Sequence, residues 1–236
     1  MKKINFRDLI LYEDDDYIIV NKPPFIASLK DRNDKISIQS LAVDYCPDSS
    51  LCHRLDKETS GTLAIAKNKE AYKNLSLQFE HRKVLKIYHA VVVGVHDYKN
   101  LKVNMPILVN SRGTVRIDRN GKEAKTVFNS VKAYSGHTLV SCELLTGRTH
   151  QIRIHLAKKG SPIVGDLEYG GEFLFLSTIK KKFNLKKYTE EEPLMKRVAL
   201  HAYTIGFSYS DKQFREIMAP YPKDFKVLIN QLEKNS

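Results

Sequence analysis

The chain opens with two short apolar runs, Leu9–Tyr12 and Tyr17–Val20. The four acidic residues from Glu13 to Asp16 separate them. Runs of β-prone residues joined by a short polar segment are typical of a β-hairpin. The second run should end before Pro23, because proline has no N–H to donate to a sheet.

Several later segments have apolar residues at helical spacing. Asn68 is suited to cap one of these helices, since its side chain can accept a backbone N–H of the first turn. Gly160 follows another, in the position where a left-handed residue commonly ends a helix. The predicted helices are Ser37–Tyr45, Asn68 to Arg82 (with Ala71, Leu75 and Phe79 on one face), Thr149–Lys159 and Pro222–Leu232.

Further strands alternate with these helices. The pattern predicts strands over Thr62–Ala66 and Lys86–Gly94, and a hairpin over Val127–Leu145 that turns at Ser135-Gly136. The basic segment Lys180–Lys187 has weak periodicity, which indicates an exposed insertion. We predict an α+β fold, a mixed and mostly antiparallel sheet with flanking helices, forming a single domain over residues 1–236.

Charge and cysteine content narrow the class of protein. Lys and Arg number 39 and Asp and Glu 27, so the net charge is +12. A surplus of this size favours polyanionic partners such as nucleic acid, although a generic lysine-rich surface would produce it too. The three cysteines have no CxxC spacing, which argues against a disulfide framework or a zinc site. With no long apolar segment, we expect a soluble cytoplasmic protein without membrane contact.

The densest polar cluster is His53–Gly61, a loop that precedes a predicted strand. Asp56 stands between the cations Arg54 and Lys57, which favours its ionised form. A carboxylate in this setting is suited to act as a nucleophile or a base. The alternative is a surface turn with local charge pairing. Gly61 allows an unusual backbone angle where the loop enters the strand.

A second cluster runs from Thr146 to His155. If Thr149 caps the helix, Arg153 lies one turn further along the same face, where its guanidinium could clamp a carboxylate or a phosphate. His150 and His155 are five residues apart and therefore lie on different faces. We interpret both as structural histidines rather than metal ligands.

A third cluster stands at the head of the strand Lys86–Gly94. Strand alternation puts Lys86, Tyr88 and Ala90 on one face and His89 on the other. A tyrosine that faces a site offers a flat surface for a nucleobase. Core filling by a β-prone aromatic is the alternative.

Together these clusters resemble the RluA-type family of RNA pseudouridine synthases. The similarity covers nearly the whole chain, with its motifs in the expected order. They are an ILYED to NKPP segment at Ile10–Pro24, HRLD-x-x-TSG at His53–Gly61, K-x-Y-x-A-x-V-x-G at Lys86–Gly94, TGRTHQIRxH with G-x-P-I-x-GD and YG at Thr146–Gly170, and LHA at Leu200–Ala202 with Ala219-Pro220 downstream.

The resemblance implies a role for individual residues. Asp56 matches the catalytic aspartate, Tyr88 the tyrosine that stacks on the target base, and Arg153 the arginine that pairs with the aspartate. Arg54 matches the arginine that occupies the space of a flipped nucleotide. The residues expected to bind substrate are His53, Arg54, Thr59, Arg148, Thr149 and His150.

The expected reaction isomerises uridine in structured RNA, with no metal and no organic cofactor. Asp56 would act as a nucleophile or would start an elimination through a glycal, and both routes stay open. The expected partner is RNA, ribosomal slightly favoured over transfer RNA, and the expected state is a monomer. Two other classes compete, a catalytically silent RNA-binding protein on the same fold and a metal-dependent nuclease or glycosidase, which would need clustered ligands.

The chain departs from the family pattern in three places. Phe25 to Ser28 replace a stretch where many members have a glycine and a later His-Pro pair. The motifs begin near Met1, so we expect no S4-type domain, and RNA selection should rest on the catalytic domain. We also hypothesise that Lys180–Lys187 contacts RNA phosphates, with a solvated loop as the alternative.

Overall fold

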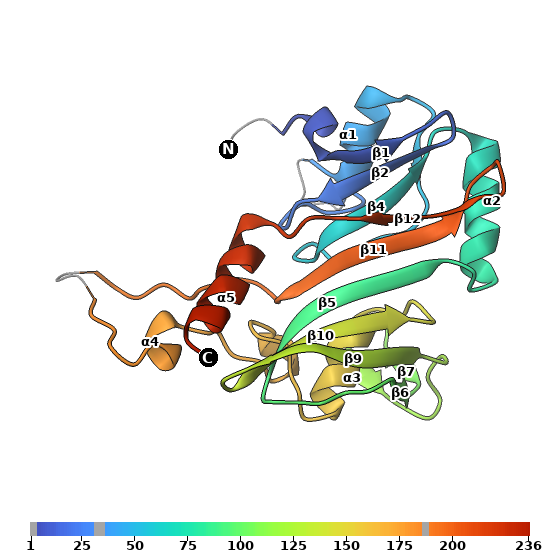
Figure 1. The fold of residues 1–236 in the computed structure, drawn as a ribbon. Helices are drawn as coiled ribbons and strands as arrows, with labels where there is room; N and C mark the ends of the chain where they lie inside the picture. Colours follow the sequence, from blue (N-terminus) through green and yellow to red (C-terminus); the bar gives the residue numbers. More distant parts are fainter. Residues whose placement is uncertain (1–3, 31–35, 186–188) are drawn as a thin grey trace. The chain divides into compact units, whose positions relative to one another are not determined.

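The computed structural model describes residues 4–30, 36–185 and 189–236 (Figure 1). Contacts along the chain group it into two compact units, each made of two stretches of sequence. The first unit comprises Met1–Ile87 and His201–Pro220, and the second comprises Tyr88–Leu200 and Tyr221–Ser236. The single domain over residues 1–236 stays a prediction.

The first unit starts with the predicted hairpin. Strands β1 (Ile10–Glu13) and β2 (Tyr17–Lys22) pair antiparallel, and β2 ends immediately before Pro23. The carboxylate of Asp14 closes the turn, because its Oδ1 accepts the amides of Asp16 at 2.9 Å and Tyr17 at 2.7 Å. The acidic connection is therefore a hydrogen-bonded turn rather than only a solvated loop.

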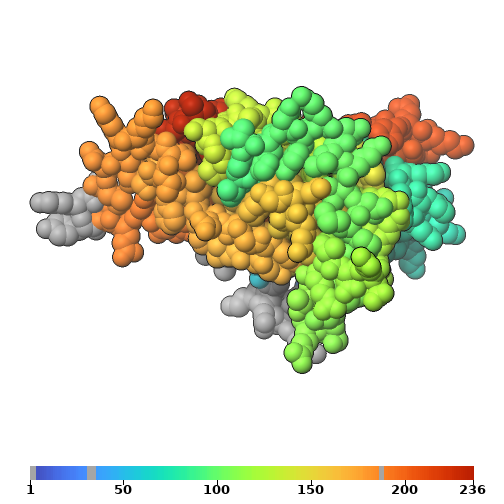
Figure 2. Space-filling view, turned by 90° about the horizontal axis from the view of Figure 1, so that it is seen from below, coloured from blue at the N-terminus to red at the C-terminus, as the bar shows by residue number. Residues whose placement is uncertain are grey.

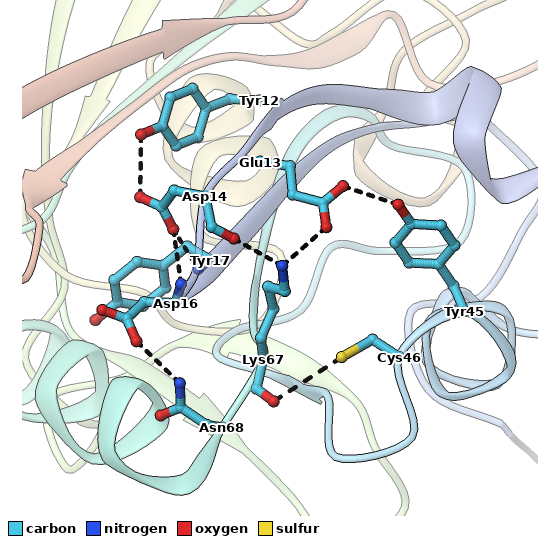
Figure 3. Close-up of polar contacts among 9 residues, drawn as sticks. All are labelled: Tyr12, Glu13, Asp14, Asp16, Tyr17, Tyr45, Cys46, Lys67 and Asn68. Atoms are coloured by element: carbon cyan, nitrogen blue, oxygen red, sulfur yellow. Dashed lines mark hydrogen bonds and ion pairs between the residues drawn. The ribbon is translucent and has the colours of Figure 1, made fainter.

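Lys67 ties this turn to the rest of the unit (Figure 3). Its Nζ donates to Glu13 Oε1 at 3.0 Å and to the carbonyl of Asp14 at 2.7 Å. The hydroxyl of Tyr45 donates to the other oxygen of Glu13 at 2.9 Å. One ammonium thus offsets part of the charge of an acidic turn and holds it in place.

The sheet of the first unit is mostly antiparallel, as predicted. Strand β2 pairs antiparallel with β4, and β4 pairs parallel with β11. The edge strands β12 and β3 pair antiparallel with β11 and β4. The bounds are β3 Ser50–Leu51, β4 Ser60–Ala66, β11 Leu200–Ser208 and β12 Phe214–Met218.

Two helices and a short 3-10 turn, η1 (Phe6–Leu9), complete this unit. Helix α1 (Ile38–Tyr45) starts with a capping box at Ser37. Helix α2 (Lys69–Glu80) is capped by Asn68, whose side chain accepts the Ala71 amide at 2.8 Å. Both starts were predicted. Helix α2 ends two residues earlier than expected, because Arg82 has a left-handed φ of 57°.

The second unit contains a sheet in the order β5, β10, β9, β6 and a separate hairpin of β7 and β8. The predicted hairpin is confirmed, with β9 and β10 turning at Ser135-Gly136. The bounds are β5 Leu85–Val93, β6 Leu101–Asn104, β7 Ile107–Val109, β8 Val115–Ile117, β9 Lys125–Tyr134 and β10 His137–Leu144.

Helix α3 (Gln151–Lys158) corrects one prediction. Thr149 does not cap it: the capping position is His150, which has a left-handed φ of 53° and makes no side-chain cap bond. The sharp turn into the helix is held instead by the side chain of Gln151, whose Oε1 accepts the amide of Arg148 at 3.0 Å. At the other end Gly160 has the predicted left-handed φ, at 74°.

The remaining elements are η2 (Leu167–Tyr169), the one-turn α4 (Leu176–Ile179) and the terminal α5 (Lys223–Lys234), which extends two residues beyond the prediction. Residues 180–185 form an irregular segment with mostly exposed side chains. Lys186 and Lys187, the end of the predicted insertion, lie outside the described residues. Within the described part of the chain, every helix is too short or too polar to span a bilayer.

Candidate active site

The predicted catalytic loop lies in the first unit, between β3 and β4. Asp56 is partly buried, while Arg54 and Lys57 are exposed on either side of it. The carbonyl of Asp56 accepts the amide of Thr59 at 3.0 Å, which closes a four-residue turn. The carboxylate therefore stands on a closed turn between two exposed cations.

A buried lysine supports the backbone of this loop. Lys22 is fully buried at the end of β2, and its Nζ donates to three carbonyls. These belong to Pro23 at 3.1 Å, Ile26 at 2.8 Å and Lys57 at 3.1 Å. Three acceptors match the three donors of an ammonium, which makes its burial tolerable. The arrangement places a positive charge at the backbone of the residue that follows Asp56.

Two further bonds connect the loop to the segment after β2. The hydroxyl of Ser28, which is buried, donates to the Leu55 carbonyl at 2.8 Å and accepts the Leu55 amide at 2.9 Å. The amide of Phe25 donates to the Lys57 carbonyl at 2.8 Å. Backbone groups on both sides of Asp56 are thus held, so the position of the carboxylate is determined by tertiary contacts.

Beyond the loop, Gly61 enters β4 with φ +117°, which confirms the predicted unusual angle. A Cβ at this glycine would lie only 2.1 Å from the carbonyl oxygen of Ala202, its parallel partner on β11. Next to it, Ser60 and His201 Nδ1 are 2.9 Å apart. His201 Nε2 lies 3.1 Å from the carbonyl of Ala219, so Nε2 carries the proton and Nδ1 accepts the serine hydroxyl.

His53 has a structural contact in the first unit. Its Nε2 accepts the amide of Ala64 at 3.0 Å, and its ring packs against Phe79 at 5.1 Å. Burial, with a smaller contribution from Lys86, lowers the pKa of His53 to about 3. Thr59 is also buried, with 3% of its surface exposed. The His53 ring and the backbone amide of Thr59 hold the loop, and the contact of either residue with substrate stays a prediction.

Arg153, in the second unit, is held in one orientation by acids. Its Nε and Nη2 donate to the two oxygens of Asp166, both at 2.7 Å, and Nη2 donates to Glu168 at 2.8 Å. The guanidinium lies 4.9 Å from the ring centre of Tyr169. Asp166 is 1% exposed and Arg153 9%, so this is a buried bidentate pair rather than a surface one.

The turn before Arg153 is built around Gln151, which is 2% exposed. Its Oε1 accepts from the hydroxyl of Thr146 at 2.8 Å as well as from the Arg148 amide. Its Nε2 donates to the Lys125 carbonyl and to the hydroxyl of Thr126, both at 2.9 Å. All four hydrogen-bonding positions of the amide are used, so the turn is anchored to β9.

The two histidines of this segment have different surroundings. His155 is buried, donates from Nε2 to the Met105 carbonyl at 3.0 Å and accepts at Nδ1 from Thr126 at 3.0 Å. Burial lowers its pKa. His150 lies 2.9 Å from the hydroxyl of Tyr169. The structural interpretation of His155 agrees with these contacts. Nowhere in residues 4–30, 36–185 and 189–236 do three potential metal ligands cluster.

Arg148 and Thr149 border a hollow of about 370 Å³. Lys122 and Asn120 also line it, and Arg148 is oriented by a bond from its Nε to the Glu123 carbonyl at 3.0 Å. Figure 2 shows the β7–β8 segment, green, next to the segment that carries α3, yellow-orange. Two cations and two neutral polar groups around one hollow suit a phosphate.

Tyr88 is 9% exposed on β5 and Ala90 is fully buried, while His89 between them is half-buried. His89 contacts the hydroxyl of Tyr221, and burial lowers its pKa to about 4. The predicted alternation is therefore seen at residues 88–90.

A family model described as RNA pseudouridylate synthase matches residues 16–158. The chain belongs to this family. It is 37% identical to the ribosomal large subunit pseudouridine synthase C of Buchnera aphidicola subsp. Baizongia pistaciae, over 97% of this chain and 72% of the relative. It is 34% identical to the enzyme of the same name in Vibrio vulnificus, over 98% and 71%.

Solved structures of similar fold are found among pseudouridylate synthases. The human RNA pseudouridylate synthase domain containing 4 matches with a TM-score of 0.77 at 24% identity, over 97% of this chain and 95% of that one. The human domain containing 1 matches with a TM-score of 0.70 at 27% identity, over 94% and 87%. The α+β fold and the RluA-type resemblance are confirmed, and the chain is an isomerase of RNA.

For a pseudouridylate synthase, the structure adds three residues that the sequence reasoning did not single out: Lys22, Ser28 and Asp166. Each stands in or next to a motif, Lys22 within NKPP and Asp166 within the GD pair. Burial, which the sequence does not show directly, distinguishes these residues in the structure. For Lys22 and Asp166 it is informative because an ionised side chain is almost never fully buried without a specific set of partners. Asp56, Arg54, His53 and Thr59 belong to the first unit; the second holds Tyr88, Arg153 and the residues of the Thr146 turn.

Proposed function

We propose that this protein converts uridine to pseudouridine in structured RNA, with Asp56 as the catalytic carboxylate. The family match over residues 16–158, which includes Asp56, Tyr88 and Arg153, is the observation that carries the proposal. The bracing of the Asp56 loop by Lys22 and Ser28 supports it. A surface turn with local charge pairing needs no such buried support.

The reaction breaks the bond between N1 and the ribose and forms one from C5 to the same carbon. N1 gains a proton and C5 loses one, so the product is an isomer and the balance requires no oxidant, reductant or cofactor. The base must turn over between the two steps, so the nucleotide has to leave the helical stack. In the first step Asp56 either attacks as a nucleophile, in a bond that breaks again as the product forms, or removes a ribose proton so that N1 leaves and a glycal forms, and this proton is returned when C5 joins the ribose.

Arg153 and Tyr88 assist this carboxylate in the proposal. Asp166 holds the Nε–Nη2 edge of Arg153. From the family resemblance, we assign Arg153 the role of keeping Asp56 ionised and oriented. Tyr88 stacks on the uracil and fixes its plane, and Arg54 fills the space that the flipped nucleotide leaves. His53 and Thr59 maintain the loop.

We further propose that the substrate is RNA of the large ribosomal subunit, in the cytoplasm. Relatives of 34–37% identity carry that substrate in their names. The net charge of +12 supplies the attraction to phosphates that any such substrate requires. The hollow bordered by Arg148, Thr149 and Lys122 is the proposed contact for one phosphate. The described lysines of the 180–185 segment are proposed as a second contact.

The deciding experiment maps pseudouridines in cells that lack the protein and in cells that express Asp56→Asn instead. We expect at least one site to vanish, wild type to restore it, and Asp56→Asn not to. With purified protein, the single-turnover rate of Asp56→Asn should fall at least about a thousandfold, as for loss of an essential catalytic group. RNA affinity should not fall, since a negative charge near phosphates has been removed.

Glu58→Gln is the matched control, because it makes the same carboxylate-to-amide change on an exposed residue of the same loop. It should restore the site. Restoration by Asp56→Asn would refute the catalytic assignment. If no pseudouridine depended on the protein, the catalytically silent RNA-binding protein would become the better description.

A further inference from the structure

Phe25 is an unusual residue next to the catalytic loop. It has φ +66°, the left-handed region, in which a bulky side chain is strained. It is 53% exposed, so burial of apolar surface offsets this strain only in part. Strained conformations of this kind persist where the surrounding structure imposes them, and they concentrate at functional sites.

The backbone around Phe25 is held on both sides. Its own amide donates to the carbonyl of Lys57 at 2.8 Å. The carbonyls of Pro23, two residues before it, and of Ile26, directly after it, accept from the buried ammonium of Lys22 at 3.1 and 2.8 Å. The same bonds that hold the Asp56 loop therefore fix the direction in which the ring of Phe25 leaves the backbone.

The backbone near Phe25 also carries exposed apolar side chains and exposed cations. Leu29 and Ile36 are each 49% exposed. A β-bridge between Ala27 and Ser37 brings the backbone next to Ile36 close to the backbone that follows Phe25. Arg54 and Lys57 are exposed on the loop to which Phe25 is bonded. Exposed aromatic and apolar groups beside cations match the two parts of an unpaired nucleotide, a flat base and a phosphate.

We propose that Phe25 is a specificity-determining residue whose ring stacks on a nucleobase that flanks the target uridine. This inference rests on the proposed function, because the ring can stack on a base beside the target uridine only if that uridine binds at Asp56. The loop bond from Phe25 to Lys57 then couples the position of the flanking base to that of the catalytic loop. The strained backbone presents the ring to the RNA at the cost of some stability.

The test compares Phe25→Leu with Phe25→Tyr. Leucine keeps the apolar bulk and the same backbone strain but has no aromatic face, whereas tyrosine keeps the face. On the RNA in which mapping finds a dependent pseudouridine, we expect Phe25→Leu to raise KM about tenfold with kcat within twofold of wild type. Phe25→Tyr should stay within twofold of wild type for both constants.

Two controls separate stacking from folding. Phe214→Leu removes an equally exposed aromatic (51%) in the same unit, away from the loop, and should leave KM unchanged. Phe25→Gly relieves the strain, so its urea midpoint should equal or exceed that of wild type, while its KM rises like that of Phe25→Leu. Ultraviolet crosslinking of the RNA to the Asp56→Asn protein should join a base to Phe25 and not to Phe214.

The outcomes distinguish this inference from the proposed function. If deletion of the gene removes no pseudouridine, the proposed function fails and this inference with it. If wild type modifies the RNA and Phe25→Leu has the same KM, or Phe25→Tyr is as impaired as Phe25→Leu, only the role of Phe25 is refuted. A dimer in sedimentation that Phe25→Leu dissolves would show that a second copy of the chain covers this face, and would overturn the inference.

Discussion

At the scale of single residues, the conformation of the Asp56 loop depends on residues that are packed too closely to be substituted without loss of stability. Lys22 is buried with three carbonyl partners, and Gly61 lies against the backbone of Ala202. Neither residue is expected to touch the reacting atoms. Their effect on chemistry passes through the position of the loop, so substitutions there should be seen first in stability.

Gly61→Ala should destabilise the protein by more than about 3 kcal/mol, the range of severe backbone clashes. The new Cβ would lie 2.1 Å from the Ala202 carbonyl oxygen, and φ would be +117°. Gly113→Ala is the matched control, since Gly113 also has a positive φ (+82°) but open space around it. It should cost about 1 kcal/mol in urea unfolding. Equal costs would contradict the close contact.

His53 should make stability depend on pH. Its pKa is about 3 in the folded protein against an ordinary 6.5, so the folded state keeps it neutral. Below pH 6.5 the unfolded chain binds a proton that the folded chain does not, and the free energy of unfolding falls as pH drops toward 3. The slope from this residue is at most about 1.4 kcal/mol per pH unit.

His53→Gln removes the titration but keeps an acceptor for the Ala64 amide. Urea unfolding at pH 7, 6 and 5 should show a shallower loss of stability for this variant than for wild type. Parallel curves for the two proteins would mean that His53 has the same pKa in the folded and the unfolded protein, and would contradict its burial as a neutral ring.

At the scale of elements, helix α5 is attached to the rest of the second unit by an ion pair between a buried arginine and a partly exposed aspartate. Arg197 is 1% exposed, and its Nε and Nη2 donate to Asp224 at 2.7 and 3.1 Å. Its Nη1 donates to the carbonyls of Val198 and Leu200, both at 3.3 Å. One guanidinium thus joins the first turn of the helix to the segment that leads into β11.

Arg197→Met should destabilise the protein by at least about 2 kcal/mol, because it removes the cation that neutralises the partly buried Asp224 and a donor to the Leu200 carbonyl. Lys132→Met breaks an exposed pair with Glu233 at the other end of α5, where the side chains are 53% and 40% exposed. That variant should lose less than about 1 kcal/mol. Thermal unfolding of both would measure the difference, and similar losses would refute the special role of Arg197.

At the scale of the whole molecule, the two units are interleaved along the chain. The chain passes from one unit to the other at residues 87–88, 200–201 and 220–221. Two of these crossings fall within strands, β5 and β11. Neither unit is therefore a continuous segment that could be cut out with its elements intact.

We predict one cooperative unfolding transition for the full chain, in keeping with a single catalytic domain. Residues 88–200 expressed alone should not fold, since they lack α5 and the partner that Arg197 requires. Urea unfolding followed by circular dichroism and by tyrosine fluorescence should give coincident curves. Separate transitions, or a folded fragment 88–200, would show two independent domains instead.

Local sequence was sufficient for the four longer helices and for six of the twelve strands that the structure describes. Asn68 caps α2, prolines end β2, and Ser135-Gly136 turns the β9–β10 hairpin, because each effect acts within a few residues. The sequence also determined the family, through motifs spread over most of the chain. Local rules failed where a distant partner intervened: Thr149 loses the cap because Gln151 is bonded to β9.

Only the tertiary structure decided which residues support the candidate site. Lys22 and Ser28 stand 34 and 28 positions before Asp56, and Asp166 stands 13 positions after Arg153. No helical or strand periodicity links residues at these separations. Their roles arise from burial, which requires each buried donor and acceptor to find a partner wherever the chain brings one. The sequence by itself determined which chemical groups the loop contains, and the fold determined how rigidly those groups are positioned.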